Sequence, residues 1–197
     1  MSVERFELGA IAPQPWKNGA GLTREIAWGG RSSADFNWRI SVADVARDAS
    51  FSAFPGIDRC ITLLCGAGMR LRSHNGRNGR IDHRLTEPLA PFYFPGDVPL
   101  DATLVAGASR DFNVMVRRGA FRAEVTCHRG AAELHGGDVT LLLCVAGRWR
   151  VTAGEPLAVG PMQALLWREP TAAVRIAPLS EAAPALLFVR LCHDRPP

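Results

Sequence analysis

The chain has 197 residues, of which 47% are hydrophobic and 21% are charged, and its formal net charge is +4. This balance excludes an intrinsically disordered protein and allows a sizeable core, in one large domain or in two small ones. Lys17 is the one lysine, so arginines supply most of the positive charge, and they are dispersed along the chain. Because nucleic-acid binding favours a clustered basic stripe, we expect no nucleic-acid partner.

The first residues and the apolar runs of the chain bear on its location. Charged residues at Glu4, Arg5 and Glu7 stand where the apolar segment of a secretory signal would begin. The longest apolar runs, at 141–146 and 185–189, are too short to span a bilayer. The five cysteines form no C-x-x-C pair, which is typical of reduced thiols. We therefore expect a cytoplasmic protein with no membrane partner.

Alternation of side-chain type predicts strands along the whole chain. Residues 36–45 carry Trp38, Ile40 and Val42 on one face and Arg39, Ser41 and Ala43 on the other. Residues 111–117 likewise oppose Phe112, Val114 and Val116 to Asn113, Met115 and Arg117. Shorter apolar runs predict further strands at 22–28, 61–65, 69–72, 80–85, 91–94, 102–105, 139–145, 148–152, 163–167, 173–177 and 185–192. A single helical turn is expected at 43–49, and a hairpin tip at 75–79, where Asn-Gly pairs occur.

A near-repeat indicates two related halves. Leu64-Cys65-Gly66-Ala67-Gly68 is similar to Leu143-Cys144-Val145-Ala146-Gly147, and in both an apolar strand meets a glycine turn and continues as a strand with arginine. The alternative is that strand–turn–strand segments look alike by chance. Many short strands favour an all-β sandwich or barrel. We predict two antiparallel β-barrels or sandwiches that share a sheet, with the first at 1–118 and the second, shorter one at 119–197.

The segment 15–26 is the richest in polar and special residues. Trp16, Lys17 and Asn18 precede two glycines there, and glycine lets the backbone approach a ligand closely. The segment is no phosphate-binding fingerprint, because the third glycine of that motif is replaced by Arg24 and no helix pattern follows. The alternative is a terminal loop in which Lys17 is simply solvated.

Two arginines offer a planar fork of donors that suits a carboxylate or phosphate. Arg59 lies in the segment 51–59 together with Ser52, and the alternative is that it pairs with Asp58 at the surface. Arg39 shares a strand face with Ser41. If that face is interior, Arg39 needs an anionic ligand or an acid, the candidates being Asp111, Asp97 and Glu25. If the face is exposed to solvent, the presence of Arg39 gives no evidence of a binding site.

Metal and nucleophile chemistry receive little support from the pattern. No two of the five histidines are separated by a single residue, so we expect no metal and no other cofactor. No G-x-S-x-G motif is present. The pairs Cys127-His128 and Cys192-His193 are sequence neighbours, which in a strand point to opposite faces. No residue is therefore predicted to be catalytic.

The chain resembles the HutD/Ves family of bacterial proteins. The resemblance rests on segments in the order of the chain: 15–26, 38–43 (Trp-Arg-Ile-Ser-Val-Ala), 51–59 (Phe-Ser-Ala-Phe-Pro-Gly-Ile-Asp-Arg), 94–97 and 111–115. One departure is Ala20, where the family usually has glycine. The resemblance implies a bicupin fold and a link to histidine utilisation, in which members are thought to bind an intermediate such as N-formylglutamate and limit flux. Other members are linked to stress responses.

Residues and resemblance together predict a non-catalytic binder of a small anionic, carboxylate-bearing metabolite. The predicted ligand-binding residues are Trp16, Lys17, Asn18, Thr23, Arg39, Ser41, Ser52, Arg59, Asp97 and Asn113. One alternative is a metal-independent isomerase or hydrolase in which Lys17, if buried, is a general base. Another is a protein-interaction module that controls a regulator. A homodimer is left open.

Overall fold

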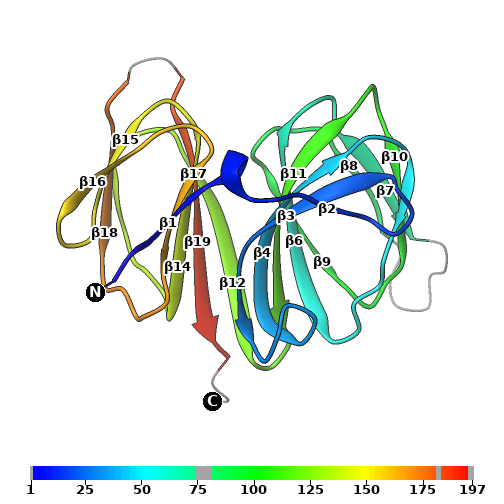
Figure 1. The fold of residues 1–197 in the computed structure, drawn as a ribbon, viewed down its shortest axis with the longest axis horizontal. Coiled ribbons are helices and arrows are strands. Elements are labelled where there is room, and N and C mark those ends of the chain that lie inside the picture. The colour runs from blue at the N-terminus through cyan, green and yellow to red at the C-terminus, as the bar shows by residue number, and fades with distance from the viewer. Residues whose placement is uncertain (1, 74–80, 181–182, 195–197) are drawn as a thin grey trace. The chain divides into compact units, whose positions relative to one another are not determined.

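The computed structural model describes residues 2–73, 81–180 and 183–194. Apart from a 3₁₀ turn at Leu8–Ala10, the regular structure of these residues consists of β-strands (Figure 1). The chain divides into a first unit, Ala12–Ala120, and a second unit, Met1–Ile11 with Phe121–Pro197. No helix in the described part of the chain is long and apolar enough to cross a bilayer.

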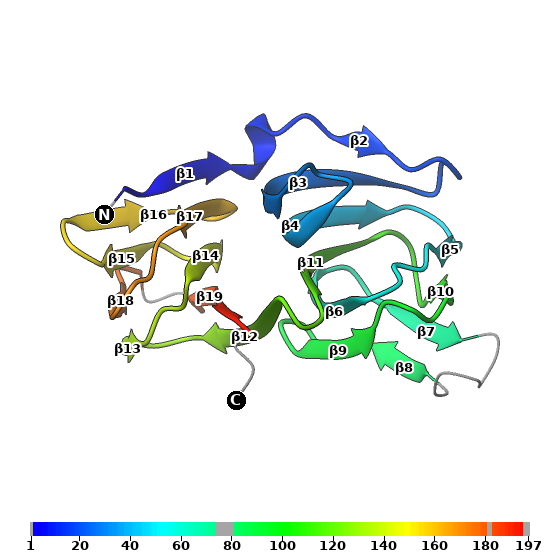
Figure 2. The same ribbon diagram turned by 90° about the horizontal axis from the view of Figure 1, so that it is seen from below.

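The first unit consists of two antiparallel sheets (Figure 2). The six-stranded sheet has the order β2 (Gln14–Pro15), β3 (Gly21–Gly30), β4 (Phe36–Val45), β11 (Ser109–Arg117), β6 (Ile57–Cys65) and β9 (Pro91–Pro95). The four-stranded sheet has the order β5 (Ala49–Phe51), β10 (Leu100–Leu104), β7 (Met69–Ser73) and β8 (Asp82–Leu85). Buried side chains of both sheets form one apolar cluster that includes Ile61, Leu71, Leu100 and Phe94.

The second unit has the same construction. Its five-stranded sheet has the order β1 (Glu4–Glu7), β17 (Gln163–Trp167), β14 (Val139–Ala146), β19 (Ala185–His193) and β12 (Phe121–His128). Its four-stranded sheet has the order β13 (Ala132–Leu134), β18 (Val174–Pro178), β15 (Trp149–Thr152) and β16 (Pro156–Val159). The two sheets enclose an apolar core in which Trp149, Trp167, Leu142 and Phe188 are buried.

The strand order repeats between the units. The order β4-β11-β6-β9 corresponds to β12-β19-β14-β17, and β5-β10-β7-β8 corresponds to β13-β18-β15-β16, an offset of eight strands throughout. The fold is therefore all-β, with two antiparallel units of the same topology, as the sequence predicted. Of the two predicted forms, barrels or sandwiches, the units are open sandwiches. One detail differs: every sheet in the described residues takes its strands from one unit, so the expected shared sheet is wrong.

The near-repeat in the sequence marks equivalent corners. Residues 66–68 join β6 to β7, and residues 147–148 join β14 to β15, so at both places the chain passes from the large sheet to the small one. Gly66 and Gly147 have φ values of 95° and 77°, which an L side chain rarely adopts. The glycines are therefore required by the turn.

Local patterns missed several elements. The first strand, β1, pairs with β17 in the second unit, whereas the sequence placed residues 1–118 together. The helical turn expected at 43–49 is wrong, because β4 continues to Val45 and β5 begins at Ala49. The strands that were not predicted are β1, β2, β5, β12, β13 and β16. The hairpin tip at 75–79 lies outside the described residues.

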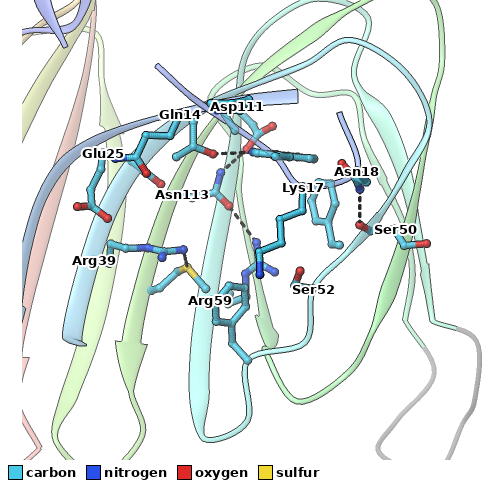
Figure 3. A pocket seen from close by; sticks show the side chains of 18 residues that line it. Gln14, Lys17, Asn18, Glu25, Arg39, Ser50, Ser52, Arg59, Asp111 and Asn113 are labelled. Atoms are coloured by element: carbon cyan, nitrogen blue, oxygen red, sulfur yellow. Dashed lines mark hydrogen bonds between the residues drawn. The ribbon is translucent and has the colours of Figure 1, made fainter. Parts of the chain in front are cut away.

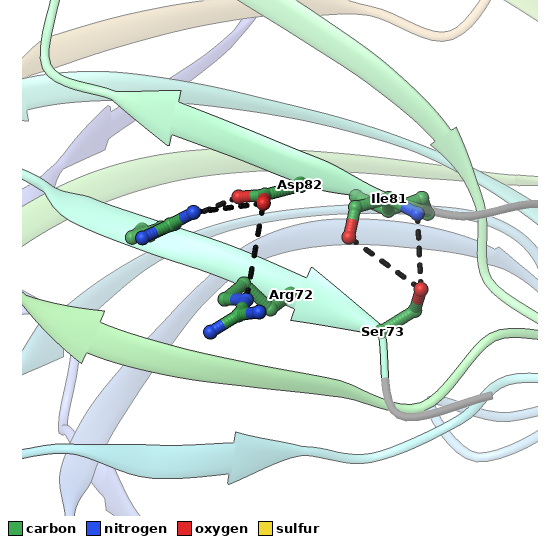
Figure 4. Close-up of polar contacts among 5 residues, drawn as sticks. Arg72, Ser73, Ile81 and Asp82 are labelled. Atoms are coloured by element: carbon green, nitrogen blue, oxygen red, sulfur yellow. Dashed lines mark hydrogen bonds and ion pairs between the residues drawn. The ribbon is translucent and has the colours of Figure 1, made fainter. Parts of the chain in front are cut away.

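Polar contacts hold β7 and β8 together at the margin of the small sheet (Figure 4). Arg70 donates two hydrogen bonds to the Asp82 carboxylate, at 2.7 and 2.8 Å, and Arg72 lies 3.9 Å from the same group. The Ser73 hydroxyl accepts a hydrogen bond of 3.0 Å from the backbone N–H of Ile81. These groups are substantially exposed, so they fix the pairing of the strands more than they stabilise the fold.

Candidate functional site: a polar cavity in the first unit

A cavity of about 430 Å³ lies in the first unit (Figure 3). Its walls come from the face of the six-stranded sheet formed by β3, β4, β11 and β6, and from β2, β5 and the loops that follow these two strands. The lining residues are Gln14, Pro15, Trp16, Lys17, Asn18, Thr23, Glu25, Arg39, Ser41, Ala43, Ser50, Phe51, Ser52, Phe54, Arg59, Asp111, Asn113 and Met115.

Strand register brings the polar side chains of the sheet together. Residues directly opposite one another in an antiparallel pair point to the same face. Asn113 on β11 lies opposite Ser41 on β4, and two residues further along β11, Met115 lies opposite both Arg39 on β4 and Arg59 on β6. The polar side of the alternation predicted at 36–45 and 111–117 is thus one continuous wall of the cavity.

Arg59 is the most enclosed cation of the wall, with 8% of its surface exposed. Its guanidinium group lies 5.0 Å from the ring of Phe94, 5.5 Å from Phe54 and 5.7 Å from Phe51. Nη2 donates to Asn113 Oδ1 at 3.3 Å, whereas Nε is buried and has no partner among the described residues. Burial lowers the pKa of Arg59 to about 10, which leaves it charged at neutral pH.

Arg39 is the second cation of the wall and is half-buried. Its guanidinium group lies 4.8 Å from the ring of Phe36 and 5.4 Å from that of Phe54. Nη2 donates to the sulfur of Met115 at 3.1 Å, a weak acceptor, and Nε is buried with no partner in the described part of the chain. Burial lowers the pKa of Arg39, and the nearby charge of Glu25 partly opposes this effect.

Asp111 and Asn113 connect to Arg59 in a short chain of hydrogen bonds. The amide nitrogen of Asn113 donates to Asp111 Oδ1, while its oxygen accepts from Arg59. Asp111 is fully buried, and its Oδ2 atom has no partner among the described residues. Burial raises the pKa of Asp111 to about 7, although the hydrogen bond from Asn113 and the charge of Arg59 act in the opposite direction. Burial also raises the pKa of Glu25.

The loop between β2 and β3 forms the exposed side of the cavity. Trp16 donates through Nε1 to the Thr23 hydroxyl at 2.7 Å, and its ring meets Phe51 edge-on at 5.5 Å. Asn18 is occupied in holding the loop, because its Oδ1 accepts from the N–H of Ala20 at 3.1 Å. Lys17 is exposed and lines the cavity, with no hydrogen bond or ion pair to a described residue.

The cavity collects all but one of the residues predicted to bind a ligand, the exception being Asp97. Asp97 accepts from the N–H of Gly56 at 2.9 Å and pairs with Arg118 at 2.7 Å. Asp58, the alternative partner of Arg59, also pairs with Arg118 at 2.7 Å. Both acids therefore bind groups at or near the turn before β6, namely Arg118 and the backbone of Gly56. Arg59 has no ion pair among the described residues.

Several lining residues were absent from the predicted set. Asp111 and Met115 share the period of two with Asn113, so the alternation in 111–117 was a sufficient signal for them. The sequence offers Glu25 and Asp111 as acids that could pair with Arg39, and it gives no separate signal that Glu25 lines a cavity. The residues contributed by the short strands and loops carried no such signal, namely Gln14, Pro15, Ser50, Phe51 and Phe54.

The donor set of the cavity favours an anion over a cation. Guanidinium groups donate hydrogen bonds and cannot ligate a metal ion. Within the described residues, no group of three or more His, Cys, Asp or Glu side chains is arranged to hold a metal ion.

Comparison with solved structures identifies the class of fold. The chain is similar to the protein Ylba from E. coli, with a TM-score of 0.70 and 8% identity over 99% of this chain and 92% of that one. It is also similar to an oxalate decarboxylase from Lactobacillus farciminis, with a TM-score of 0.70 and 8% identity over 98% and 86% of the chains. At such low identity the likeness concerns the fold alone, which is that of the cupin-like proteins.

More similar structures narrow the class to a family. A conserved protein of unknown function from Pseudomonas aeruginosa PAO1 has a TM-score of 0.85 and 29% identity over 98% of this chain and all of that one. HutD from Pseudomonas fluorescens SBW25 has a TM-score of 0.82 and 28% identity over 98% and 99% of the chains. The HutD family model matches residues 9–184, and the chain belongs to the HutD family. Membership agrees with the link to histidine utilisation that the resemblance implied.

Proposed function

We propose that the first unit binds a small dicarboxylate metabolite without catalysing its conversion. The ligand we favour is N-formylglutamate, and its binding limits flux through histidine utilisation. One observation carries the proposal: Arg39 and Arg59 line the same cavity, and each has a buried Nε without a partner among the described residues. An uncompensated buried cation is costly, so a bound carboxylate would stabilise both arginines.

The spacing of the two arginines suits a ligand with two anionic ends. Arg39 and Arg59 both lie opposite Met115, on the strands that flank β11. Neighbouring strands are about 4.8 Å apart, so the two arginine backbones are separated by roughly 10 Å. Their side chains converge on a cavity of about 430 Å³, which falls within the range of roughly 300–1,000 Å³ for small-molecule sites.

Binding is a better account of the cavity than the enzymatic alternative built on Lys17. A lysine acts as a general base at neutral pH when burial lowers its pKa. Lys17 is exposed, so that condition is not met. An exposed ammonium group at the edge of the cavity instead suits attraction of an anion.

Thermal unfolding in the presence of N-formylglutamate, glutamate, urocanate and histidine tests the ligand class. A ligand at about 100 times its Kd should add about 2.7 kcal/mol of stability, a few degrees in Tm. We expect the dicarboxylates to raise Tm and N-formylglutamate to raise it most. No shift with any of the four compounds would refute the proposed ligand class.

A matched pair of variants ties the shift to the cavity. Arg59→Met removes the buried cation while keeping a long side chain, and it should abolish the ligand-induced shift. Arg118→Met removes an arginine that pairs with Asp58 and Asp97 away from the cavity, and it should keep the shift. An unchanged shift in Arg59→Met would show that the anion binds elsewhere.

The effect on flux is tested in cells that grow on histidine. A chromosomal Arg59→Met substitution should reproduce the growth and the N-formylglutamate level of a strain that lacks the protein, because both have lost the binding site. Arg118→Met should behave as wild type. If Arg59→Met lost binding in vitro but behaved as wild type in cells, binding would be unconnected with flux.

A further inference from the structure

Asp111 is an acid of the cavity wall whose buried carboxyl is only partly satisfied by the described residues. It is fully buried, one carboxylate oxygen accepts from Asn113, and the other, Oδ2, is buried with no partner among the described residues. Asp111 makes no ion pair within 4.0 Å to a described residue, although Arg59 lies in the same wall. A buried oxygen without a partner, in a residue that lines a cavity, is placed to meet a ligand atom.

The charges that line the cavity bear on the protonation of Asp111. Among the described residues, the ionisable groups of the lining are three cations, Lys17, Arg39 and Arg59, and two carboxylates, Glu25 and Asp111. A dianion added to this set leaves one negative charge in excess, which one proton would neutralise. The ligand also displaces water and brings negative charge, and both effects disfavour an ionised carboxylate nearby.

We propose that Asp111 takes up a proton from solvent when the anion binds and donates it, through Oδ2, in a hydrogen bond to an oxygen atom of the ligand. The inference rests on the proposed function, and it assigns to the ligand an acceptor oxygen, carboxylate or acyl carbonyl, within reach of Asp111. No covalent bond of the ligand changes. Asn113 fixes which oxygen carries the proton, because its N–H already occupies Oδ1.

Charged groups on the strands around Asp111 act on its protonation in opposite directions. Arg59 on β6 favours the ionised form, whereas Asp44 on β4 favours the protonated form and is itself held by Arg24 and Arg110. Burial outweighs these effects and raises the pKa of Asp111 to about 7 in the unliganded protein. Glu25 on β3 is the other acid of the lining, but it is half-exposed and interacts with Arg39. No histidine is among the described residues of the lining.

Calorimetric titration with N-formylglutamate measures the proton directly. Titrations in two buffers of different ionisation enthalpy give the number of protons exchanged on binding. We expect wild type to take up close to one proton at about pH 8, where free Asp111 is mostly ionised, and close to none at about pH 6. The affinity should accordingly fall by up to about tenfold for each pH unit above about pH 7.

Two variants assign the proton to its site. Asp111→Asn keeps the shape of the side chain and offers a permanent N–H donor, so it should bind at about pH 8 at least as tightly as wild type and take up no proton. Glu25→Gln is the matched control. It neutralises one charge of the lining, but the ligand still displaces water from the buried Asp111 carboxyl and brings negative charge to it, so most of the uptake should remain. Melting curves of both variants establish that they fold, and the uptake by wild type is informative without either variant.

The outcomes separate this inference from the function on which it rests. Binding by wild type at about pH 8 without proton uptake would overturn the role of Asp111 and leave the binding function intact. Uptake that survives in Asp111→Asn but disappears in Glu25→Gln would assign the proton to the wrong acid and also overturn it. No binding heat at either pH, with no thermal shift, would overturn both.

Discussion

The two units share one order of strands but differ in what fills their interiors. Where β11 pairs with β6, and where β19 pairs with β14, the register shifts at one place, between Arg110 and Asp111 in the first unit and between Ala185 and Leu186 in the second. Alignment of these two irregularities makes Leu186 the equivalent of Asp111 and Phe188 the equivalent of Asn113. The same alignment places Thr140 at the position of Arg59.

This difference shows that the sandwich itself does not require polar interior residues. Leu186 and Phe188 are buried in the apolar core of the second unit, where they pack among residues of both sheets. The first unit carries a carboxyl and an amide at the same two places, and both are buried. Since unpaired buried polar groups destabilise a fold, the polar wall of the first unit is better explained by a ligand than by stability.

The largest expected effect comes from placing the buried acid of the first unit at the equivalent apolar position of the second unit. Leu186→Asp introduces into the second unit the residue that the first unit holds at the equivalent place. The neighbouring residues on the same face of β14 and β19 are Leu142, Cys144 and Phe188, which offer no cation or amide, and Arg190 further along β19 is paired with Glu124. We therefore expect a loss of about 3–5 kcal/mol of unfolding free energy, or failure to fold. Urea denaturation followed by tryptophan fluorescence measures the loss. Leu186→Met is the control and should cost less than about 1.5 kcal/mol.

A small cost for Leu186→Asp, below about 1 kcal/mol, would break the comparison. It would mean that this position accepts a carboxyl in either unit and that Asp111 requires no special environment.

The next effect concerns the pH dependence of stability. The pKa of Asp111 is raised to about 7 in the folded protein, so the folded state binds more protons than the unfolded state between about pH 4 and pH 7. The stability that Asp111 contributes is therefore present below about pH 4 and lost as the pH rises through about 7. Asp111→Asn removes this dependence, and relative to wild type it should gain on the order of 2–4 kcal/mol across this window.

Denaturation of wild type and Asp111→Asn at a series of pH values measures this difference. Other acids cancel in the comparison, including Asp44 and Asp97, whose pKa values are lowered by their arginine partners. Parallel pH curves for the two proteins would show that Asp111 titrates in the folded state as it does in the unfolded chain.

The sequence predicted which strand faces are polar better than it predicted the environment of each residue in the cavity. The alternation through Arg39 and Ser41 identifies a strand with one polar face, because period two is a local property of the backbone. It does not reveal which strands flank β4, because the pairing of β11 with both β4 and β6 joins residues far apart in the chain. The environment of Asp111 depends on that pairing, so its burial could not be read from residues 111–117 alone.

Short strands explain most of the remaining differences. β5 and β13 have three residues each, which is too few for alternation to be recognised. Ser50 and Phe51 reach the cavity from β5, so two lining residues were lost with that strand. β1 has four residues and finds its partner, β17, at the other end of the chain, a pairing that no local pattern reports.

Loss of the bridging amide should have an intermediate effect. Asn113→Leu makes this position apolar, like the equivalent Phe188 of the second unit. It removes the hydrogen-bond partner of both Arg59 and Asp111. Buried polar groups left unsatisfied cost about 1–3 kcal/mol each, and a disordered Arg59 should weaken ligand binding by roughly 10- to 100-fold. Calorimetric titration with N-formylglutamate gives the affinity. Asn37→Leu, at an exposed position of β4, is the control and should bind normally.

The smallest expected effect concerns the strands that the first unit has in addition to the repeat. β2 and β3 extend the large sheet beyond β4, and the second unit has no strand beyond the equivalent β12 in the described residues. The loop that joins them carries Lys17, whose exposed ammonium group meets the ligand in water, where an ion pair is worth about 0.2–1 kcal/mol. Lys17→Gln should therefore weaken binding by about threefold at low salt and by less at high salt, while Lys17→Arg keeps the affinity. Titrations at two salt concentrations measure both. A loss of more than about 30-fold that persists at high salt would mean that Lys17 is enclosed with the ligand, and the decisive difference between the units would then lie in the added loop as much as in the polar wall.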